Sequence, residues 1–337
     1  MADTPLLTLR PNASRDATNQ PLTPTANGAL RVINNEWLIE EGTTNYVANP
    51  LAWNDLEGYE ITTGVTLDRI TEGEHAPYIR VNTDGSEPYQ HAVFYYETPP
   101  LAELPDPYTA TVSVSMKTQD TVALVARVYI DGWSGTHDVP LPVEGTGGDW
   151  ARLSSTVTSD PGDTISDTRI IVASSWYGDS LETHVDTSEW QIEQKDHATT
   201  FCPQLDSQGN LLDGYAWTGV PHASPSTREA ASLSAPIPST WKSLYIRYHE
   251  GDGTLTNAYM TDEGTIGEYG TLSIADDTAT FSSGRALYLN GALFFERELT
   301  ETEQGILDQR STLDWNALVQ DPRMVAMQRL KLINLSV

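Results

Sequence analysis

Two stretches decide the fold: EWLIEEGTTNYVANP, from Glu36 to Pro50, and EWQIEQKDHATTFCP, from Glu189 to Pro203. The first holds a short apolar run, a turn at 40–42 and an extended segment that stops before its final proline, because the residue before a proline is pushed out of the helical region. In the second, Trp190 and Ile192 alternate with polar residues, so one side is apolar and the other faces solvent. We therefore predict strand, turn and strand in the first stretch, and a last strand with a proline-stopped exit in the second.

Between these stretches the apolar residues come in short alternating segments that Asp, Gly and Pro turns separate. No segment sustains a helical repeat, and Val122 to Ile130 is almost continuously apolar, which is typical of a central buried strand. The predicted strands are 78–81, 91–96, 109–116, 122–130, 150–157 and 169–174. Many short strands joined by polar turns predict a sandwich or jelly roll.

A second set of strands is predicted at 215–218, 243–248, 271–274, 278–281 and 286–295. Thr300 to Glu303 then forms a capping box, in which the threonine hydroxyl and the glutamate satisfy each other's backbone amides. A short helix is expected from Glu301 to about Arg310.

The predicted fold class is all-β, with two β-sandwich domains of jelly-roll type, an extended N-terminal arm and a short C-terminal helix. We assign residues 1–35 to the arm, 36–203 to the first jelly roll, 204–310 to a smaller sandwich and 311–337 to a C-terminal docking segment. Packing of that last segment on its own domain is an equally good alternative to docking on another subunit.

The two opening motifs carry a resemblance. They are similar to the first and last strands of carbohydrate-binding-type jelly-roll modules in tail and fibre proteins of tailed viruses, over roughly Trp37 to Pro203. GYAWTGVPHASPSTRE, from Gly214 to Glu229, and ALYLNGALFFERELTETEQGIL, from Ala286 to Leu307, resemble the entry and exit of a concanavalin-like, laminin-G-type domain. That region is shorter than such domains usually are, so we expect a reduced sandwich or one completed by residues of the arm.

Charge excludes some partners. The chain has 47 acidic and 19 basic residues, a net charge of -28, and the acids are spread along its whole length. A uniformly negative surface repels nucleic acid and anionic membranes. An ordinary acidic extracellular protein is one explanation, but we favour adaptation to high salt, because carboxylate repulsion is screened once the Debye length falls to about 3 Å at 1 M.

The expected cellular context follows from three features that the sequence lacks: a disulfide, a signal peptide and a membrane-spanning stretch. One cysteine, Cys202, allows no intrachain disulfide, and the first residues resemble no signal peptide. No stretch is long enough to cross a membrane, so membrane insertion is not expected. These features predict a virion component, which is assembled inside the cell and released by lysis.

Catalytic motifs are not found: the sequence has no nucleophile elbow, no HExxH, no P-loop and no Cys or His cluster. We therefore expect a protein that is not an enzyme. Aromatic residues in polar turns suit sugar stacking, which points to Trp133 and to Trp176 and Tyr177 as glycan or partner contacts. Alternatively, these rings fold back as lids over their own sandwich.

The remaining tryptophans of this region divide differently. Trp150 and Trp190 are assigned to the core, and Trp53 fits either setting. Calcium is a recurrent structural ion in the jelly-roll modules that the chain resembles, where it is held by carboxylates at strand ends. By that resemblance Glu40, Glu41 and Asp186 are candidate metal ligands.

The resemblance implies a structural protein of a tailed virus of a halophile, most simply of a halophilic archaeon. As a tail fibre, spike or baseplate component it would bind a host cell-surface glycan or glycoprotein and other virion proteins. A homotrimer is expected, because multivalency converts weak single-site affinity into avidity. The alternatives are a capsid decoration or vertex protein and, less favoured, a secreted glycan-active enzyme.

Overall fold

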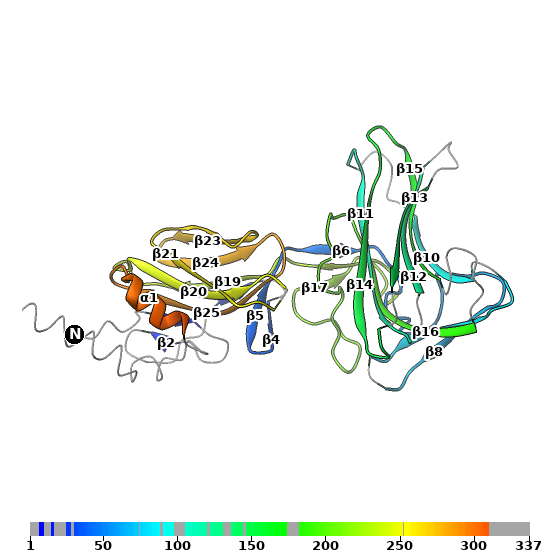
Figure 1. Cartoon of the computed structure of the whole chain (residues 1–337), viewed down its shortest axis with the longest axis horizontal. Helices are drawn as coiled ribbons and strands as arrows, with labels where there is room; N and C mark the ends of the chain where they lie inside the picture. The colour runs from blue at the N-terminus through cyan, green and yellow to red at the C-terminus, as the bar shows by residue number, and fades with distance from the viewer. Residues whose placement is uncertain are drawn as a thin grey trace, which may run out of the picture. The chain divides into compact units, whose positions relative to one another are not determined.

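The chain folds into two units, each of which is described by itself. The computed structural model describes residues 7–9, 15–16, 25–27, 30–73, 75–87, 90–97, 105–119, 122–130, 136–143, 146–173, 182–251 and 253–309. Unit 1 takes residues 1–42 and 229–337, and unit 2 takes residues 43–228 (Figure 1). Unit 2 is therefore inserted into the chain of unit 1.

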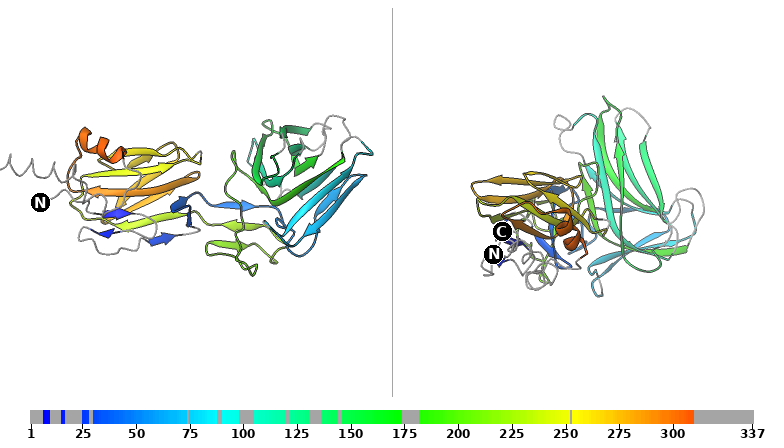
Figure 2. Two further views of the ribbon diagram at one scale, coloured as in Figure 1. Left: turned by 60° about the horizontal axis from the view of Figure 1, so that its bottom comes forward. Right: turned by 60° about the vertical axis from the view of Figure 1, so that its left-hand side comes forward.

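Unit 2 is a sandwich of two five-stranded antiparallel sheets. The first sheet holds, in pairing order, β13 (Thr136–Val143), β12 (Val122–Ile130), β15 (Ile165–Ala173), β10 (His91–Glu97) and β7 (Tyr59–Ile61). The second holds β14 (Ala151–Thr158), β11 (Thr109–Lys117), β16 (Glu182–Glu193), β9 (Tyr78–Asp84) and β8 (Val65–Ile70). Figures 1 and 2 show these sheets as two layers.

Alternation along the strands explains the layering. In β11 the apolar residues Ala110, Val112, Val114 and Met116 face the core, while the residues between them, threonine and serine, lie on the other face. Trp190 of β16 packs fully buried in the same core. Deleting a ring of that size from a core removes about 3–5 kcal/mol of stability.

A small third sheet closes unit 2 where the chain enters and leaves it. It contains β17 (Tyr215–Trp217), β18 (Ser226–Arg228) and β6 (Thr43–Asn45), and β18 pairs with both of the others. The entry strand and the exit strand therefore lie side by side. Adjacent ends are what an inserted domain needs, because the host chain can then continue without distortion.

Unit 1 is a second antiparallel sandwich. Its larger sheet holds β2 (Arg15–Asp16), β1 (Leu7–Leu9), β25 (Leu287–Phe295), β20 (Ser243–His249) and β21 (Thr256–Met260), with β5 (Glu36–Ile39) also on β25 and β4 (Arg31–Ile33) on β5. The other sheet holds β22 (Gly264–Ile266), β23 (Gly270–Ala275), β24 (Thr278–Ser283), β19 (Ser232–Pro236) and β3 (Thr25–Asn27).

The central strand β25 is apolar on both faces because each face has a cover. Leu287, Leu289 and Phe294 contribute to the core between the sheets. Leu293 and Phe295 pack instead with Leu307 of helix α1 (Glu301–Asp308), which lies on the opposite face (Figure 2). The predicted capping box is present at Thr300 and Glu303.

The all-β sandwich fold predicted from the sequence is confirmed. The predicted boundaries are not those of the structure, because β5 pairs with β25 across some 250 positions of sequence, as in the register of Trp37 with Leu289. Strands of the expected arm, β1, β3 and β4, likewise join the sheets of unit 1. The second sandwich is therefore completed by the N-terminal residues, and residues 311–337 lie outside the described residues.

Candidate functional site

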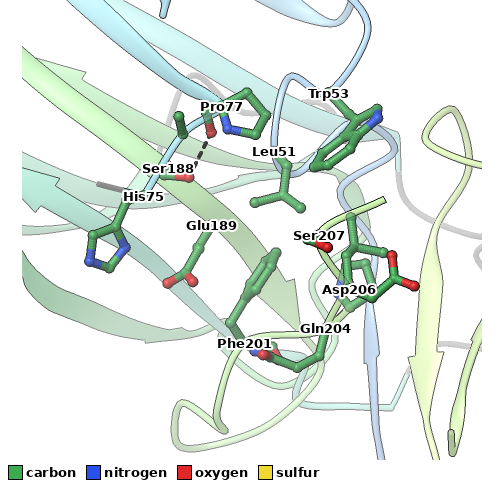
Figure 3. Close-up of a pocket in the computed structure, with 13 residues that line it drawn as sticks. Leu51, Trp53, His75, Pro77, Ser188, Glu189, Phe201, Gln204, Asp206 and Ser207 are labelled. Atoms are coloured by element: carbon green, nitrogen blue, oxygen red, sulfur yellow. Dashed lines mark hydrogen bonds between the residues drawn. The ribbon is translucent and has the colours of Figure 1, made fainter. Parts of the chain in front are cut away.

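A pocket of about 400 Å³ opens on unit 2, on the polar face of the sheet that contains β16. Its walls come from the segment after β6, the segment before β9, strand β16 itself and the exit segment after it (Figure 3). The lining residues are Leu51, Trp53, His75, Ala76, Pro77, Ser188, Glu189, Phe201, Pro203, Gln204, Leu205, Asp206 and Ser207. Aromatic rings and hydrogen-bonding groups are thus combined in one concave site.

A β-bulge presents Glu189 to the pocket. On β11, Ser113 pairs with Gln191 and Ser115 pairs with Ser188, so β16 carries one extra residue at this point. Glu189 lies in that bulge with a φ of 54°, a left-handed conformation that is uncommon for residues other than glycine. Bulges re-aim side chains, and Figure 3 shows the Glu189 carboxylate between His75 and Phe201.

The side chain of Arg152, on β14, stabilises the bulge of β16 through hydrogen bonds. Its Nη1 atom donates a 2.9 Å hydrogen bond to the carbonyl oxygen of Glu189, and its Nη2 atom donates a 2.8 Å bond to the Ser113 hydroxyl. The guanidinium carbon lies 5.4 Å from the centre of the Phe201 ring, a cation–π contact. Desolvation lowers the pKa of Arg152, and the charge of Glu189 acts in the opposite direction.

The Glu189 carboxylate is held by one oxygen only. The hydroxyl of Ser115 donates to Oε2, and Arg152 Nη1 lies 3.5 Å from the same atom. Oε1 receives no hydrogen bond from any residue that the structure describes. A ligand hydroxyl or ammonium group could therefore donate to a carboxylate whose position is already fixed.

Trp53 forms the wall on the other side of the pocket. Arg69 donates from Nε to the carbonyl oxygen of Ala52 at 2.5 Å and from Nη2 to that of Trp53. Gly209 lies directly against the indole: a Cβ atom at this position would be 2.5 Å from Trp53 Cζ2. The φ of Gly209, 82°, also favours glycine. The ring is therefore fixed both through its backbone and through its face.

The turn that carries Gly209 is ordered by Asp206. Asp206 Oδ1 accepts from the backbone amides of Gln208 and Asn210, at 2.8 and 2.9 Å, and Oδ2 accepts from the Asn210 side chain at 3.0 Å. These bonds, led by that of the Asn210 side chain, lower the pKa of Asp206. The carboxylate lines the pocket rim as a fixed negative charge.

His75 lines the pocket and packs on Trp150, which is not itself a lining residue. Their ring centroids are 4.7 Å apart, and Tyr78 meets the other side of Trp150 edge-on at 5.4 Å. Trp150 is half-buried rather than a core residue as predicted, because it precedes β14 and packs against His75 and Tyr78. The other predicted core tryptophan, Trp190, is fully buried.

Backbone strain is concentrated around this pocket. Ala52, His75, Glu189 and His222 all have positive φ, of 48°, 61°, 54° and 58°. His222 stacks on the Trp53 ring. Such conformations persist where the surrounding structure over-determines them, and they cluster at ligand sites.

The residues predicted as glycan contacts, Trp133, Trp176 and Tyr177, lie outside the described residues. Two of the three predicted metal ligands form hydrogen bonds with arginines. Glu40 accepts a 2.8 Å hydrogen bond from Arg31, and Asp186 takes two from Arg80, at 2.7 and 3.0 Å. Glu41 follows Glu40 in unit 1. In the described ranges, no three His, Cys, Asp or Glu side chains gather at metal-binding spacing.

Sequence reasoning missed the pocket as a site. The sequence pattern fits Trp53 either in the core or on the surface, and it predicts Glu189 only as a polar strand residue. The one available signal was a tryptophan in the turn-rich segment that follows Pro50. No signal marked Glu189, since the bulge depends on pairing with a distant strand.

No protein-family model and no curated protein sequence matches the chain. Solved structures do match. One is the enzymatically active domain of bacteriophage CBA120 tailspike protein 4, at 10% identity and TM-score 0.32, over 44% of this chain and 21% of that one. Another is a family 16 carbohydrate-binding module, at 12% identity and TM-score 0.33, over 44% of this chain and 99% of that one.

A third match is the CBM22-1 xylan-binding domain from Paenibacillus barcinonensis Xyn10C. It has 14% identity and TM-score 0.33, over 47% of this chain and 99% of that one.

Helix α1, the helix in the described part of the chain, has eight residues, too few to cross a bilayer.

Proposed function

We propose that unit 2 binds a glycan in the pocket beside the bulge of β16. The observation that carries this proposal is the Glu189 carboxylate, held beside the Phe201 ring and across the pocket from Trp53, with one oxygen that receives no hydrogen bond from the described residues (Figure 3). A pyranose ring has an apolar C–H face and hydroxyl edges. The aromatic rings of the pocket can stack on the C–H face, and the carboxylate can accept hydrogen bonds from the hydroxyl groups.

The charge of the pocket selects the class of sugar. Two carboxylates, Glu189 and Asp206, line it, and none of its 13 lining residues is lysine or arginine. Arg152 does not line the pocket, and its Nη1 atom already donates a hydrogen bond to the carbonyl oxygen of Glu189. An acidic sugar would meet like charges in a chain of net charge -28, so the favoured ligands are neutral or amino sugars.

Binding without turnover fits Asp206 better than a role as the general acid of a glycosidase does. A glycosidase needs a carboxylic acid whose pKa is raised so that it can protonate the leaving group. The pKa of Asp206 is lowered instead, and its oxygens are used within its own turn. Incubation with oligosaccharides that bind is expected to release no reducing ends.

The biological setting that we propose is host attachment by a tailed virus of a halophile, as a trimeric tail fibre, spike or baseplate component. The acidic composition and the resemblance of the opening and closing strands support this setting. A capsid decoration protein would use the same pocket on the head. Binding in 2–4 M salt to intact halophilic cells, competed by their isolated surface glycoprotein, is the measurement that tests attachment.

The direct test is a glycan array of neutral, amino and acidic sugars, followed by calorimetric titration of the best ligand. Trp53→Ala is expected to lower affinity at least tenfold, because it removes a stacking wall. Glu189→Gln is expected to lower affinity by a similar factor, because a carboxylate hydrogen bond is stronger than a neutral one.

Matched controls exist within the chain. Glu182→Gln makes the same chemical change at an exposed position of the same strand, away from the pocket. Trp241→Ala removes a half-buried tryptophan of unit 1. Both are expected to bind as the unaltered protein does. Equal affinity in Trp53→Ala, Glu189→Gln and their controls would place the ligand elsewhere.

A further inference from the structure

A second group of rings continues from the pocket wall. The imidazole of His222 stacks on Trp53, with ring centroids 5.3 Å apart and planes 12° apart. The same imidazole also meets the Trp217 ring, with centroids 5.1 Å apart and planes 57° apart. All three rings are half-buried, so each keeps exposed surface. The three rings, called the ring row Trp53–His222–Trp217, are therefore contiguous, and the row adjoins the pocket through Trp53.

The hairpin between β17 and β18 holds this row in place. The Thr218 amide donates to the carbonyl oxygen of Pro225 at 2.9 Å, and the Gly219 amide donates to the Ser224 hydroxyl at 3.0 Å. That hydroxyl donates to the carbonyl oxygen of Val220 at 2.9 Å. The loop is therefore pre-ordered, and His222 keeps a left-handed backbone within it.

Two polar groups of the row are open to a ligand. Neither indole N–H, of Trp53 or of Trp217, donates a hydrogen bond to any part of the chain that the structure describes. The indole N–H of a buried tryptophan normally donates a hydrogen bond to a neighbouring group. Each ring is partly exposed and keeps a donor for a ligand hydroxyl.

We propose that the pocket and the ring row form one extended site for a linear oligosaccharide, in which Trp217 is the platform for a distal sugar. This inference rests on the glycan-binding function proposed above. The two centroid separations, 5.3 and 5.1 Å, together place the Trp53 and Trp217 rings at most about 10.4 Å apart. A disaccharide spans a comparable length, so consecutive sugars of one chain reach both rings.

Charge along the row agrees with the same ligand class. His222 contacts both indoles, and desolvation lowers its pKa, with a backbone hydrogen bond at Gly209 acting in the opposite direction. A neutral imidazole presents an aromatic face rather than a cation. The extended site therefore stays free of a positive charge that would favour an acidic glycan.

The experiment measures affinity against chain length. Neutral β-1,4-linked gluco-, xylo- and galacto-oligosaccharides of one to six units are titrated into the full chain by calorimetry. Affinity is expected to rise from the monosaccharide to the trisaccharide or tetrasaccharide. Trp217→Leu is expected to remove that rise, a loss of about 3- to 10-fold for the tetrasaccharide, with the monosaccharide unaffected.

Two further variants keep the result interpretable. Trp217→Phe retains a ring and should retain most of the length dependence, even if Trp217→Leu perturbs the hairpin. Val220→Ala alters the same hairpin at a residue that is 68% exposed and lies outside the row, and should bind as the unaltered chain does.

The possible outcomes separate the two proposals. Binding that is equally tight for all lengths, or a length dependence that survives in Trp217→Leu, overturns the distal platform and leaves the pocket function intact. Absence of binding by all three series and by every sugar of the array overturns the glycan-binding function and the extended site with it.

Discussion

The Nη1 atom of Arg152 donates a 2.9 Å hydrogen bond to the carbonyl oxygen of Glu189, and it does so across an intervening strand. Arg152 lies on β14 and Glu189 on β16, with β11 between them, and Nη2 binds Ser113 of that middle strand. One guanidinium therefore connects three strands beneath the pocket. It holds the bulge in the conformation that presents the carboxylate.

Arg152→Lys should weaken both stability and binding although it keeps the charge. An ammonium group cannot reproduce the planar fork that reaches both acceptors. We expect a loss of about 1–3 kcal/mol in the free energy of unfolding, because a partly buried acceptor is left unpaired. Chemical unfolding and calorimetric titration measure the two effects.

A double-mutant cycle of Arg152→Lys with Glu189→Gln tests whether Arg152 acts through the bulge. Groups that share one network are coupled by about 0.5–3 kcal/mol. Additive effects of the two substitutions on ligand affinity would contradict a positioning role for Arg152.

Gly209→Ala should lower ligand affinity through Trp53. A Cβ atom at this position would come within 2.5 Å of the indole, which must then leave its present place. Gly162→Ala is the matched control, because Gly162 has a similar φ of 87° and nothing within 4 Å of the added atom. Both variants should lose about 1–2 kcal/mol of stability from backbone strain. Only Gly209→Ala is expected to lose affinity, and equal affinities would show that Trp53 is not a contact.

Strand existence could be predicted from the sequence because period-two alternation is a local property. The predicted strand at 122–130 coincides with β12, and the short helix begins at Glu301 as its capping box indicates. Local patterns were sufficient for the fold class.

The insertion of unit 2 into unit 1 could not be predicted in the same way. It depends on the pairing of β5 with β25, and no local feature of Trp37 or Leu289 specifies a partner so distant in sequence. Residues 40–42, where a turn is predicted, separate β5 from β6 as an irregular segment and carry the chain from one unit to the other. The same residue types occur in a loop within one sandwich and in a linker between two units, so local sequence does not distinguish them.

The candidate site was hidden for a related reason. The alternation of Glu189, Trp190 and Gln191 predicts a regular strand, whereas the extra residue appears only in the register with β11. Residues such as Arg152 and Gly209 acquire their roles from neighbours in space. Of the two tryptophans of the proposed site, Trp53 lies in a turn-rich segment, whereas Trp217 lies in a predicted strand, ends the observed strand β17 and carries no such signal.

Acid should weaken unit 1 through Glu303. Desolvation raises the pKa of this carboxyl, but hydrogen bonds from Arg297 and Thr300 outweigh it and lower the pKa to about 2, from a usual 4.5. A group with a lowered pKa in the folded state contributes its stability above 4.5 and loses it as pH falls toward 2.

Glu303→Gln is therefore expected to destabilise the chain by about 1 kcal/mol above pH 4.5, with a difference that shrinks toward pH 2. Glu301→Gln, an exposed change in the same helical turn, is the control. The Tm as a function of pH measures both. A Glu303→Gln difference that stays constant between pH 5 and pH 2 would exclude this ion pair as its source.

Salt should stabilise the folded chain, and a hairpin of unit 1 offers a local test. Asp276 and Asp277 are adjacent, exposed and both left-handed, with φ of 48° and 55°. Asn-Gly is the preferred pair for such a turn, so the variant Asp276→Asn, Asp277→Gly removes two like charges and relieves the backbone. The backbone gain is independent of salt, whereas the charge gain vanishes as the Debye length falls to about 3 Å at 1 M.

The Tm of the unaltered chain is accordingly expected to rise between 0.1 and 3 M NaCl, because screening weakens repulsion within a net charge of -28. The hairpin variant should be more stable than the unaltered chain at every salt concentration, and by the larger margin at 0.1 M. A flat Tm in the unaltered chain would contradict adaptation to high salt. A margin that does not depend on salt would show that the turn is limited by its backbone alone, since repulsion between two adjacent carboxylates must respond to ions.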